Sequence, residues 1–391
     1  MNDVFIIDAL RTPFGSFSGS LAEVPAPKLA APVMAKLLEN SGLPAETVDQ
    51  VIAGQVVAGG TGQAPARQAM RFAGIPDSAG ALTINKVCGS GLKALMLGAD
   101  AIRLGDADVV IAGGMENMSL APYALPAARA GMRMGDNKAV DLMVFDALTD
   151  PYTGRHMGQV AEERVKAHQL TREAQDDYAI SSYKRSQESI KNGVFDAEIV
   201  PVVKTTRKGD IVIAKDEEPA NVNFDRLSTL RPVFDKNGSI TAANASTIND
   251  GAAFALLVSA ATVEKYGLKP KARLVSYATN SLHPDMFPDA PVGAMTKALK
   301  KAGLNIEDIG RFEINEAFAA VTMIAINELG LDRNKVNVNG GAVSIGHPVG
   351  ASGARLVATL LPELERSNER YGLATLCIGG GEAVAAVFER L

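Results

Sequence analysis

Short apolar runs alternate with helical patterns in the first and last parts of this 391-residue chain. Each run has the length of a buried strand, and each helical pattern places apolar residues on one face. Strands that alternate with helices form sheets covered by helices on both faces, so the chain is predicted to be an α/β protein. The pattern predicts strands at residues 4–8, 51–57, 83–87, 108–112, 272–277, 311–314, 336–339, 374–378 and 384–389, and helices at residues 27–40, 91–103, 292–302, 317–328 and 351–364.

Charge and composition exclude several classes of partner. The formal net charge is −5, and no lysine- or arginine-rich run is present that could neutralise a row of phosphates, so we expect no nucleic-acid partner. No apolar run approaches the roughly 18 residues that a membrane helix needs. The N-terminus enters a strand-like run without the basic start of a signal peptide, which predicts a cytoplasmic protein. Two cysteines, Cys88 and Cys377, are too few for a disulfide scaffold or a four-ligand zinc site.

Two stretches of the chain are similar to later ones. The residues 85–94 can be aligned with a stretch ending at residue 355 through a shared Ser-Gly pair, and residues 109–115 resemble residues 374–381. Two halves of the same build, packed back to back, would form a layered core with a site between them. Between the two halves, residues 119–246 differ in composition and are predicted to form a lid or an oligomerisation arm. This segment includes a polar helix expected at residues 172–191.

Four loops that follow predicted strands carry groups capable of chemistry. Cys88 lies between a strand and a helix, where the helix dipole is expected to lower the pKa of the thiol, although a lone cysteine is more often a small buried hydrophobe. His347 lies in the glycine-bracketed turn 345–353, and Cys377 precedes three glycines whose N–H groups could form an oxyanion hole. Asn315 could cap the following helix or hold a catalytic water. Because ligand sites in α/β sheets gather at such strand ends, the four loops form one candidate site.

Several motifs, in this order along nearly the whole chain, resemble the thiolases and in particular the short-chain acetoacetyl-CoA thiolases, or acetyl-CoA C-acetyltransferases. The motifs are NKVCGSG at residues 85–91, AGGMENMS at 112–119, RHMG at 155–158, TAANAS at 241–246, NEAF at 315–318, NGGAVSIGHP at 339–348 and CIGGG at 377–381. The resemblance implies a duplicated, layered α/β/α/β/α core with an inserted loop domain. It implies an N-terminal half at residues 1–118 and 247–270, a loop domain at 119–246 and a C-terminal half at 271–391.

The resemblance also implies a division of catalytic roles. Cys88 would be the nucleophile that carries the acyl group as a thioester, with His347 as its base. Cys377 would remove and return the α-proton of acetyl-CoA. The N–H groups of Cys88 and Gly379 would form one oxyanion hole, and His347 with a water held by Asn315 would form the other. Two acetyl-CoA molecules would then give acetoacetyl-CoA and coenzyme A through ping-pong kinetics, or the reverse, with no metal or redox cofactor.

Residues around the coenzyme A arm follow from the same resemblance. Ser246 matches the serine that binds the pantetheine, and Arg226 could supply charge to the nucleotide, where some relatives carry an arginine at the place of Pro219. Phe287 resembles a residue of potassium-activated members that also accept 2-methylacetoacetyl-CoA. The tunnel is expected to be lined by His156, Met157, Phe234 and Phe318. The potassium loop of that group matches Ala242, Ala243, Ala245 and Val343, with Pro219 in place of its tyrosine ligand.

A homotetramer built as a dimer of dimers is expected from the resemblance. The nearest alternative is a broad or long-chain 3-ketoacyl-CoA thiolase of fatty acid β-oxidation, which would share the reactive residues and differ in its tunnel walls. A ketoacyl synthase would share the fold but pair its cysteine with a different set of residues. A non-catalytic acyl-CoA carrier is the alternative from another class, and it would be expected to lack Cys88, His347 or Cys377.

Overall fold

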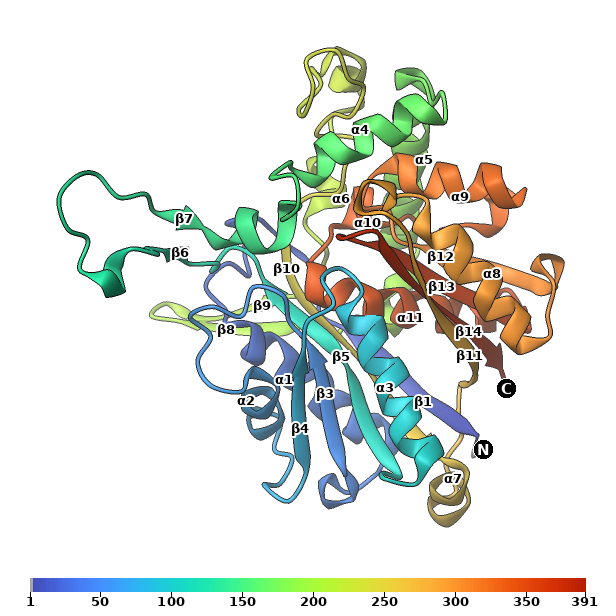
Figure 1. The fold of residues 1–391 in the computed structure, drawn as a ribbon. Coiled ribbons are helices and arrows are strands. Elements are labelled where there is room, and N and C mark those ends of the chain that lie inside the picture. Colours follow the sequence, from blue (N-terminus) through green and yellow to red (C-terminus); the bar gives the residue numbers. More distant parts are fainter. Residues whose placement is uncertain (1–2) are drawn as a thin grey trace.

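The computed structural model describes residues 3–391 and centres on one large mixed sheet (Figure 1). The strand order is β12-β13-β14-β11-β1-β10-β5-β3-β4, with β2 paired to β10. The strands of this sheet are β1 (Val4–Arg11), β2 (Gly15–Ser16), β3 (Gln50–Gly54), β4 (Gly80–Ile84), β5 (Val109–Asn117), β10 (Asn249–Ser259), β11 (Ala272–Ser281), β12 (Ile309–Ile314), β13 (Tyr371–Ile378) and β14 (Glu382–Arg390).

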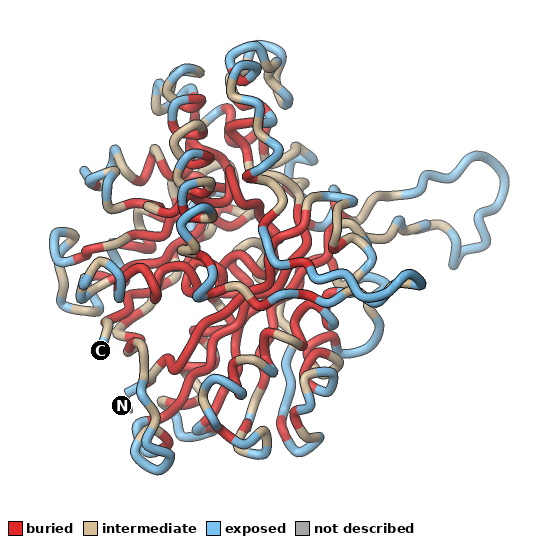
Figure 2. The backbone as a smooth tube through the Cα atoms, turned by 180° about the vertical axis from the view of Figure 1, so that it is seen from behind, coloured by how far each residue is buried: buried red, intermediate tan, exposed pale blue. Residues whose placement is uncertain are grey.

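Two helices, α3 and α11, pack between the two halves of the sheet, and other helices cover its outer faces. The helices are α1 (Ala26–Ser41), α2 (Pro65–Phe72), α3 (Ser90–Leu104), α4 (Met157–Ala167), α5 (Arg172–Lys191), α6 (Glu218–Asn221), α7 (Ala260–Tyr266), α8 (Ala290–Ala302), α9 (Ala319–Leu329), α10 (Ala342–Ile345) and α11 (Val349–Arg366). Helices α3 and α11 share one buried apolar cluster with strands of both halves of the sheet, while α1 and α2 cover one outer face and α8 the other. The predicted α/β/α/β/α layering is therefore confirmed, and Figure 2 shows the buried backbone concentrated in these layers.

Helices α3 and α11 approach each other closely because glycines stand where their backbones are in contact. A Cβ atom on Gly91 of α3 would lie 2.7 Å from the backbone nitrogen of Ala354, and one on Gly353 of α11 would lie 2.3 Å from the backbone nitrogen of Leu92. Side chains at either glycine would force the helices apart. The Ser-Gly pair shared by the two stretches of sequence thus brings the N-terminal ends of both helices, and the loops before them, side by side.

The two halves of the sheet have corresponding strand pairings. In the first, β3 runs parallel to β5, which pairs antiparallel with β10; in the second, β12 runs parallel to β13, which pairs antiparallel with β14. This order is what a duplicated α/β unit would give. Residues 119–246 stand between β5 and β10, and the exact domain boundaries stay a prediction.

The central segment contains α4, α5, α6 and two separate hairpins. The pair β6 (Tyr123–Ala124) and β7 (Val140–Asp141) carries a long exposed loop away from the body, as Figures 1 and 2 show. The pair β8 (Val202–Thr206) and β9 (Gly209–Ile213) is shorter. Within residues 3–391, no helix combines the length and apolar character needed to cross a membrane.

Most predicted elements are confirmed with small changes at their ends, but one strand is wrong. Helix α5 covers the predicted residues, and Thr171 caps it by accepting the N–H of Ala174. Residues 336–339, by contrast, form a turn in which Asn337 has a φ of 46° and its side chain bonds both backbone groups of Ile314. The amide side chain thus replaces the ladder that a strand would have made beside β12.

Candidate active site

One cavity of about 280 Å³ collects most of the predicted site residues. Cys88, His347 and Cys377 line it together with Gly379, although they come from three different loops or strand ends. The binding residues predicted for the tunnel line it as well, namely His156, Met157, Phe234, Ser246, Phe287 and Phe318. The prediction that these strand ends meet at one site is therefore confirmed by the geometry.

Cys88 stands on a tight turn between β4 and α3. Val87, just before it, has a φ of 46°, a left-handed conformation that is unfavourable for a β-branched residue. Two side chains hold the turn: Asn85 Oδ1 accepts the N–H of Val87 at 2.9 Å, and Ser90 Oγ donates to the carbonyl of Val87 at 2.7 Å. Cys88, which follows this strained residue, lines the cavity and also packs against the apolar core.

The surroundings raise the pKa of the Cys88 thiol to about 11. Burial is the largest cause, and it outweighs the N–H groups of Gly379 and of Cys88 itself, which favour the thiolate. The carboxylate of Glu116 raises the pKa further. The expectation that the helix dipole would lower this pKa is thus wrong for the protein without substrate. Cys88 rests as a thiol and requires a base to become a nucleophile.

The hydrogen bonds of His347 determine its tautomer. Nδ1 lies 2.6 Å from Ser352 Oγ, and this hydroxyl donates its one proton to the carbonyl of Pro348 at 2.9 Å. Ser352 must therefore accept from Nδ1–H, which leaves Nε2 with its lone pair. Burial and the charge of Arg355 lower the pKa of His347 to about 3, so the imidazole is neutral near pH 7. A neutral ring with Nε2 available is suited to act as a base.

Asn315 does not cap the helix that follows it. Helix α9 begins at Ala319 with Phe318 at the N-cap position, and no side chain caps it. Asn315 Nδ2 instead lies 3.4 Å from His347 Nε2, while its Oδ1 is buried without a partner. A buried amide with an unsatisfied oxygen is costly unless a ligand or water completes it. The structure therefore favours the water-holding role over the capping role.

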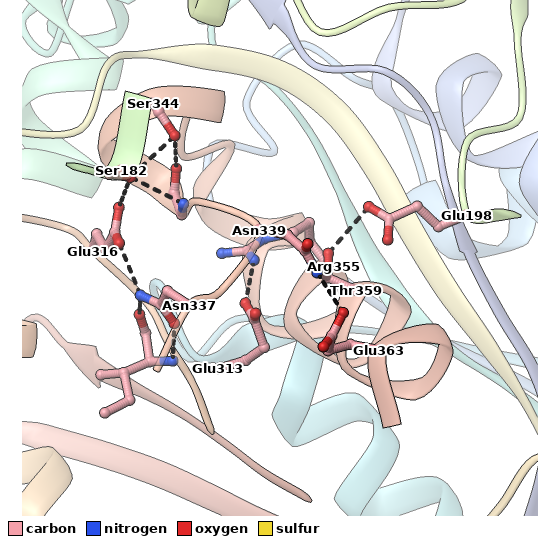
Figure 3. Close-up of polar contacts among 12 residues, drawn as sticks. Ser182, Glu198, Glu313, Glu316, Asn337, Asn339, Ser344, Arg355, Thr359 and Glu363 are labelled. Carbon is pink, nitrogen blue, oxygen red and sulfur yellow. Dashed lines mark hydrogen bonds and ion pairs between the residues drawn. The ribbon is translucent and has the colours of Figure 1, made fainter. Parts of the chain in front are cut away.

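A buried network holds the turn that carries Asn315. The next residue, Glu316, accepts the hydroxyls of Tyr178 at 2.9 Å and Ser182 at 2.7 Å, both on α5. It also accepts Asn337 Nδ2 at 2.9 Å and the N–H of Val343 at 3.1 Å. Figure 3 shows how this carboxylate joins the segments around it. The inserted segment is thereby fixed to the C-terminal half at the edge of the site.

Cys377 ends β13 and has a fully buried thiol. Burial raises its pKa well above the usual value, and the nearby Cys88 raises it further. The glycines that follow it allow close approach to the turn of Cys88: a Cβ on Gly379 would lie 3.6 Å from a methyl group of Val87. Both sulfur atoms therefore face one cavity as neutral thiols in the protein without substrate.

Aromatic rings form another part of the cavity wall, and two of them, Phe287 and Phe318, share an apolar cluster with Cys377. The imidazole of His156 stacks on Phe234 with ring centroids 4.8 Å apart, and Phe318 packs edge-on against Phe234. Phe287 contacts Phe318 at a centroid distance of 6.3 Å. Ser246 Oγ donates to the carbonyl of Ala317, so its oxygen can still accept a hydrogen bond from a ligand. The wall suits an apolar chain with a few amide groups.

Arg226 is the predicted binding residue that lies away from this cavity. It is exposed on the short helix Phe224–Thr229 and is not among the lining residues. Its position on the surface is compatible with a charged group outside the cavity, and its role stays a prediction.

The residues predicted to bind potassium lie in different environments. Ala245 lines the main cavity, Ala242 lines a neighbouring one, and Ala243 and Val343 are buried. In the turn 241–245, the carbonyls of residues 241 and 244 already accept backbone N–H groups. Pro219 contributes no side-chain oxygen, and its carbonyl accepts from a glutamine on α5. These acceptors are not the carbonyls of the residues predicted to bind potassium, so the potassium site stays a prediction, and no step is assigned to potassium.

Comparison with known proteins decides the family. The model described as the thiolase N-terminal domain matches residues 4–261, and that of the thiolase C-terminal domain matches residues 268–390. The chain belongs to the thiolase family. A relative from Cupriavidus necator, named acetyl-CoA acetyltransferase, is 51% identical over the full length of both chains, and one of the same name from Escherichia coli is 48% identical over both full lengths. The crystal structure of the Bacillus anthracis acetyl-CoA acetyltransferase shares a TM-score of 0.98 and 41% identity with this thiolase, covering all of it and 99% of that chain.

Four residues of the thiolase site were not singled out in the sequence, although each lies in or beside a recognised motif. Asn85 and Ser90 hold the turn of Cys88, Ser352 fixes the tautomer of His347, and Glu116 influences the Cys88 thiol. Their positions in or beside the motifs are the sequence feature that could have indicated these roles, because a serine or carboxylate beside a reactive group often orients it. Their partners are backbone atoms or distant residues, which sequence spacing does not reveal.

Proposed function

We propose that this thiolase is an acetyl-CoA C-acetyltransferase, which condenses two acetyl-CoA molecules to acetoacetyl-CoA and coenzyme A or catalyses the reverse thiolysis. The observation that carries the proposal is the meeting of Cys88, His347 and Cys377 in one cavity with an aromatic wall. Relatives that carry this activity in their names are about half identical over the whole chain, which supports the same reaction here.

In the first half-reaction, we propose that Cys88 attacks the thioester carbonyl of acetyl-CoA while His347 Nε2 accepts the thiol proton. The N–H groups of Cys88 and Gly379 stabilise the oxyanion. The C–S bond to coenzyme A then breaks, the imidazolium returns its proton to the departing thiolate, and acetyl-Cys88 remains. His347 is suited to this role because its pKa near 3 leaves it neutral, and the high pKa of Cys88 makes such a base necessary.

In the second half-reaction, we propose that His347, neutral again, takes the thiol proton of Cys377, which lines the same cavity. The Cys377 thiolate then removes a proton from the methyl group of another acetyl-CoA. The resulting enolate attacks the carbonyl of acetyl-Cys88, and the Cys88 sulfur leaves with the electrons of the broken C–S bond. The sulfur takes the proton held by His347, which restores both cysteine thiols and the neutral imidazole. Asn315, directly or through a water, stabilises the enolate oxygen beside His347. Coenzyme A enters and leaves as substrate and product, and no net oxidation or reduction takes place. The homotetramer and the cytoplasmic location stay predictions of the sequence.

The first test is thiolysis of acetoacetyl-CoA, 2-methylacetoacetyl-CoA and a long-chain 3-ketoacyl-CoA with coenzyme A. We expect activity on acetoacetyl-CoA and a value of kcat/KM for the long chain at least about 100-fold lower, because a buried wall that includes Phe287 limits the space near the reacting carbon. Activity on the 2-methyl substrate would make Phe287 the next position to vary. Comparable rates on the long chain would contradict the proposal and assign a general 3-ketoacyl-CoA thiolase.

Asn315→Ala should reduce catalysis far more than stability. We expect kcat to fall by about 10²- to 10³-fold, the typical cost of one oxyanion donor. Stability should change little, because the side-chain oxygen of Asn315 has no partner and the side chain caps no helix. Steady-state kinetics together with thermal unfolding checks both statements. An unchanged kcat with a lower Tm would show that Asn315 is a structural residue.

A further inference from the structure

Glu116 is a buried carboxylate near the end of β5 that has no cationic partner. Its side chain is inaccessible to solvent, and no lysine, arginine or histidine among residues 3–391 forms an ion pair with it. Instead, it accepts three backbone N–H groups, from Val56 at 2.9 Å, Val57 at 3.1 Å and Gly350 at 3.0 Å. Burial of a charge without a counter-ion raises the free energy of the folded protein. The three hydrogen bonds to Glu116 offset this cost.

The three N–H groups belong to two segments of the chain, both of which reach the apolar cluster that Cys88 contacts. Val56 and Val57 follow β3, while Gly350 lies in the first turn of α11, three residues after His347. Val56, Val57 and Val349 belong to one apolar cluster against which Cys88 packs. Glu116 thus connects the segment that follows β3 to the start of α11, next to the loop that carries His347.

The contact between the Glu116 carboxylate and Gly350 leaves no room for a side chain at residue 350. A Cβ on Gly350 would lie 2.7 Å from Glu116 Oε2, and a Cβ on Gly114, two residues before Glu116 on the same strand, would meet the Gly350 carbonyl oxygen at an impossible distance. Glycine at these positions lets the strand, the carboxylate and the start of α11 pack backbone to backbone. Any change in the size or charge of the Glu116 side chain must therefore move the loop or leave its N–H groups unpaired.

We propose that Glu116 is a positioning residue for the Cys88–His347 pair, whose carboxylate fixes the two backbone segments that pack against the thiol. The proposal deepens the function proposed above and rests on it for the activity readout. The Glu116 side chain is buried and is not among the residues that line the cavity. When Glu116 is ionised, its negative charge adds to burial, which is the larger cause, in keeping Cys88 a thiol at rest.

The electrostatic environment agrees with this placement. Burial raises the pKa of Glu116 to about 7, against the opposing effect of the three N–H groups, and the carboxylate of Asp250 on the neighbouring strand raises it further. Asp250 is itself held by Ser119 through its N–H and hydroxyl. Of these two carboxylates, Glu116 is the one that raises the pKa of the Cys88 thiol.

The decisive experiment compares Glu116→Gln with the wild type in two assays. Alkylation of Cys88 by iodoacetamide, followed by peptide mass spectrometry across pH, gives the apparent pKa of the thiol. We expect it to fall by about half a unit, or about threefold more thiolate at a fixed pH below it. Thiolysis of acetoacetyl-CoA should show kcat about 10- to 100-fold lower with KM within twofold, since a small displacement of reacting groups costs this much.

Glu162→Gln is the matched control. Glu162 on α4 is likewise buried, and it accepts the N–H groups of Ser239 at 2.9 Å and Ile240 at 2.7 Å. Removing its charge should leave both the Cys88 pKa and kcat unchanged. Equal losses in the two variants would show a general effect of neutralising a buried carboxylate and would overturn the proposal.

Glu116→Asp distinguishes the effect of side-chain length from the effect of the negative charge. It keeps the negative charge but shortens the side chain, so kcat should fall while the apparent pKa of Cys88 does not. An unchanged kcat in Glu116→Gln, an unmoved Cys88 pKa, or unfolding of both Glu116 variants would each overturn the proposal. A wild-type protein inactive on acetoacetyl-CoA would instead contradict the proposed function, while the alkylation comparison would still report the coupling between Glu116 and Cys88.

Discussion

Cys88→Ala should yield a folded protein that forms no acyl-enzyme and thiolyses acetoacetyl-CoA at least about 10⁴-fold more slowly than the wild type. Alanine removes the sulfur that must carry the acetyl group, and no other thiol occupies the same turn. His347 and the N–H groups around the site would remain, but without a nucleophile they have nothing to activate. The loss should therefore appear in kcat and in acylation together.

Incubation with acetyl-CoA followed by peptide mass spectrometry tests this directly. The wild type should give an acetylated peptide that contains residue 88, and Cys88→Ala should give none. Cys88 is half-buried beside a cavity, so the variant should lose little packing and its Tm should stay within about 3 °C of the wild type. Recovery of an acetylated peptide elsewhere, with thiolysis retained, would show that another residue is the nucleophile.

The layered fold could be predicted from the sequence because its strands and helices have clear periodicities. The apolar runs of β5 and β13 and the one-sided patterns of α1 and α3 depend on local spacing, which a single sequence shows. The meeting of Cys88 with the loops of the other half follows from the same reasoning, since strand ends of an α/β sheet gather at one edge.

The features that could not be predicted depend on partners distant in the sequence. Residues 336–339 look like a strand, yet the amide of Asn337 bonds the backbone of Ile314 and replaces the ladder. The pKa of Cys88 was expected to fall at a helix start, but burial raises it, and burial is a property of the whole fold. Asn315 has the sequence context of a cap, and its distance from His347 is what shows otherwise.

The two cysteines have different expected roles although both are neutral thiols at rest. Cys88 lies on a strained turn, is partly accessible and is approached by the Gly379 N–H. Cys377 is fully buried at the end of a strand, and its pKa is raised by burial and by Cys88. A group with so high a pKa is a poor nucleophile at rest but can exchange a proton with a carbon acid once substrate excludes water.

Cys377→Ala should therefore separate the two half-reactions. Acetylation of Cys88 by acetyl-CoA should proceed at close to the wild-type rate, because the attacking thiol, His347 and the N–H groups are unchanged. Condensation to acetoacetyl-CoA should fall by about 10²- to 10⁴-fold, the typical value of a positioned acid or base. Rapid-quench measurement of acetyl-Cys88, together with detection of acetoacetyl-CoA, checks both rates in one preparation.

A second measurement distinguishes proton transfer from general damage to the site. Wild-type enzyme incubated with acetyl-CoA in deuterated water should exchange the methyl protons of the substrate, whereas Cys377→Ala should lose this exchange while still becoming acetylated. Cys377→Ser is the conservative variant, and its hydroxyl is a weaker acid than the thiol, so we expect exchange to remain slow. If acylation and exchange fell together in Cys377→Ala, the two cysteines would act as one unit and the division of roles would be wrong.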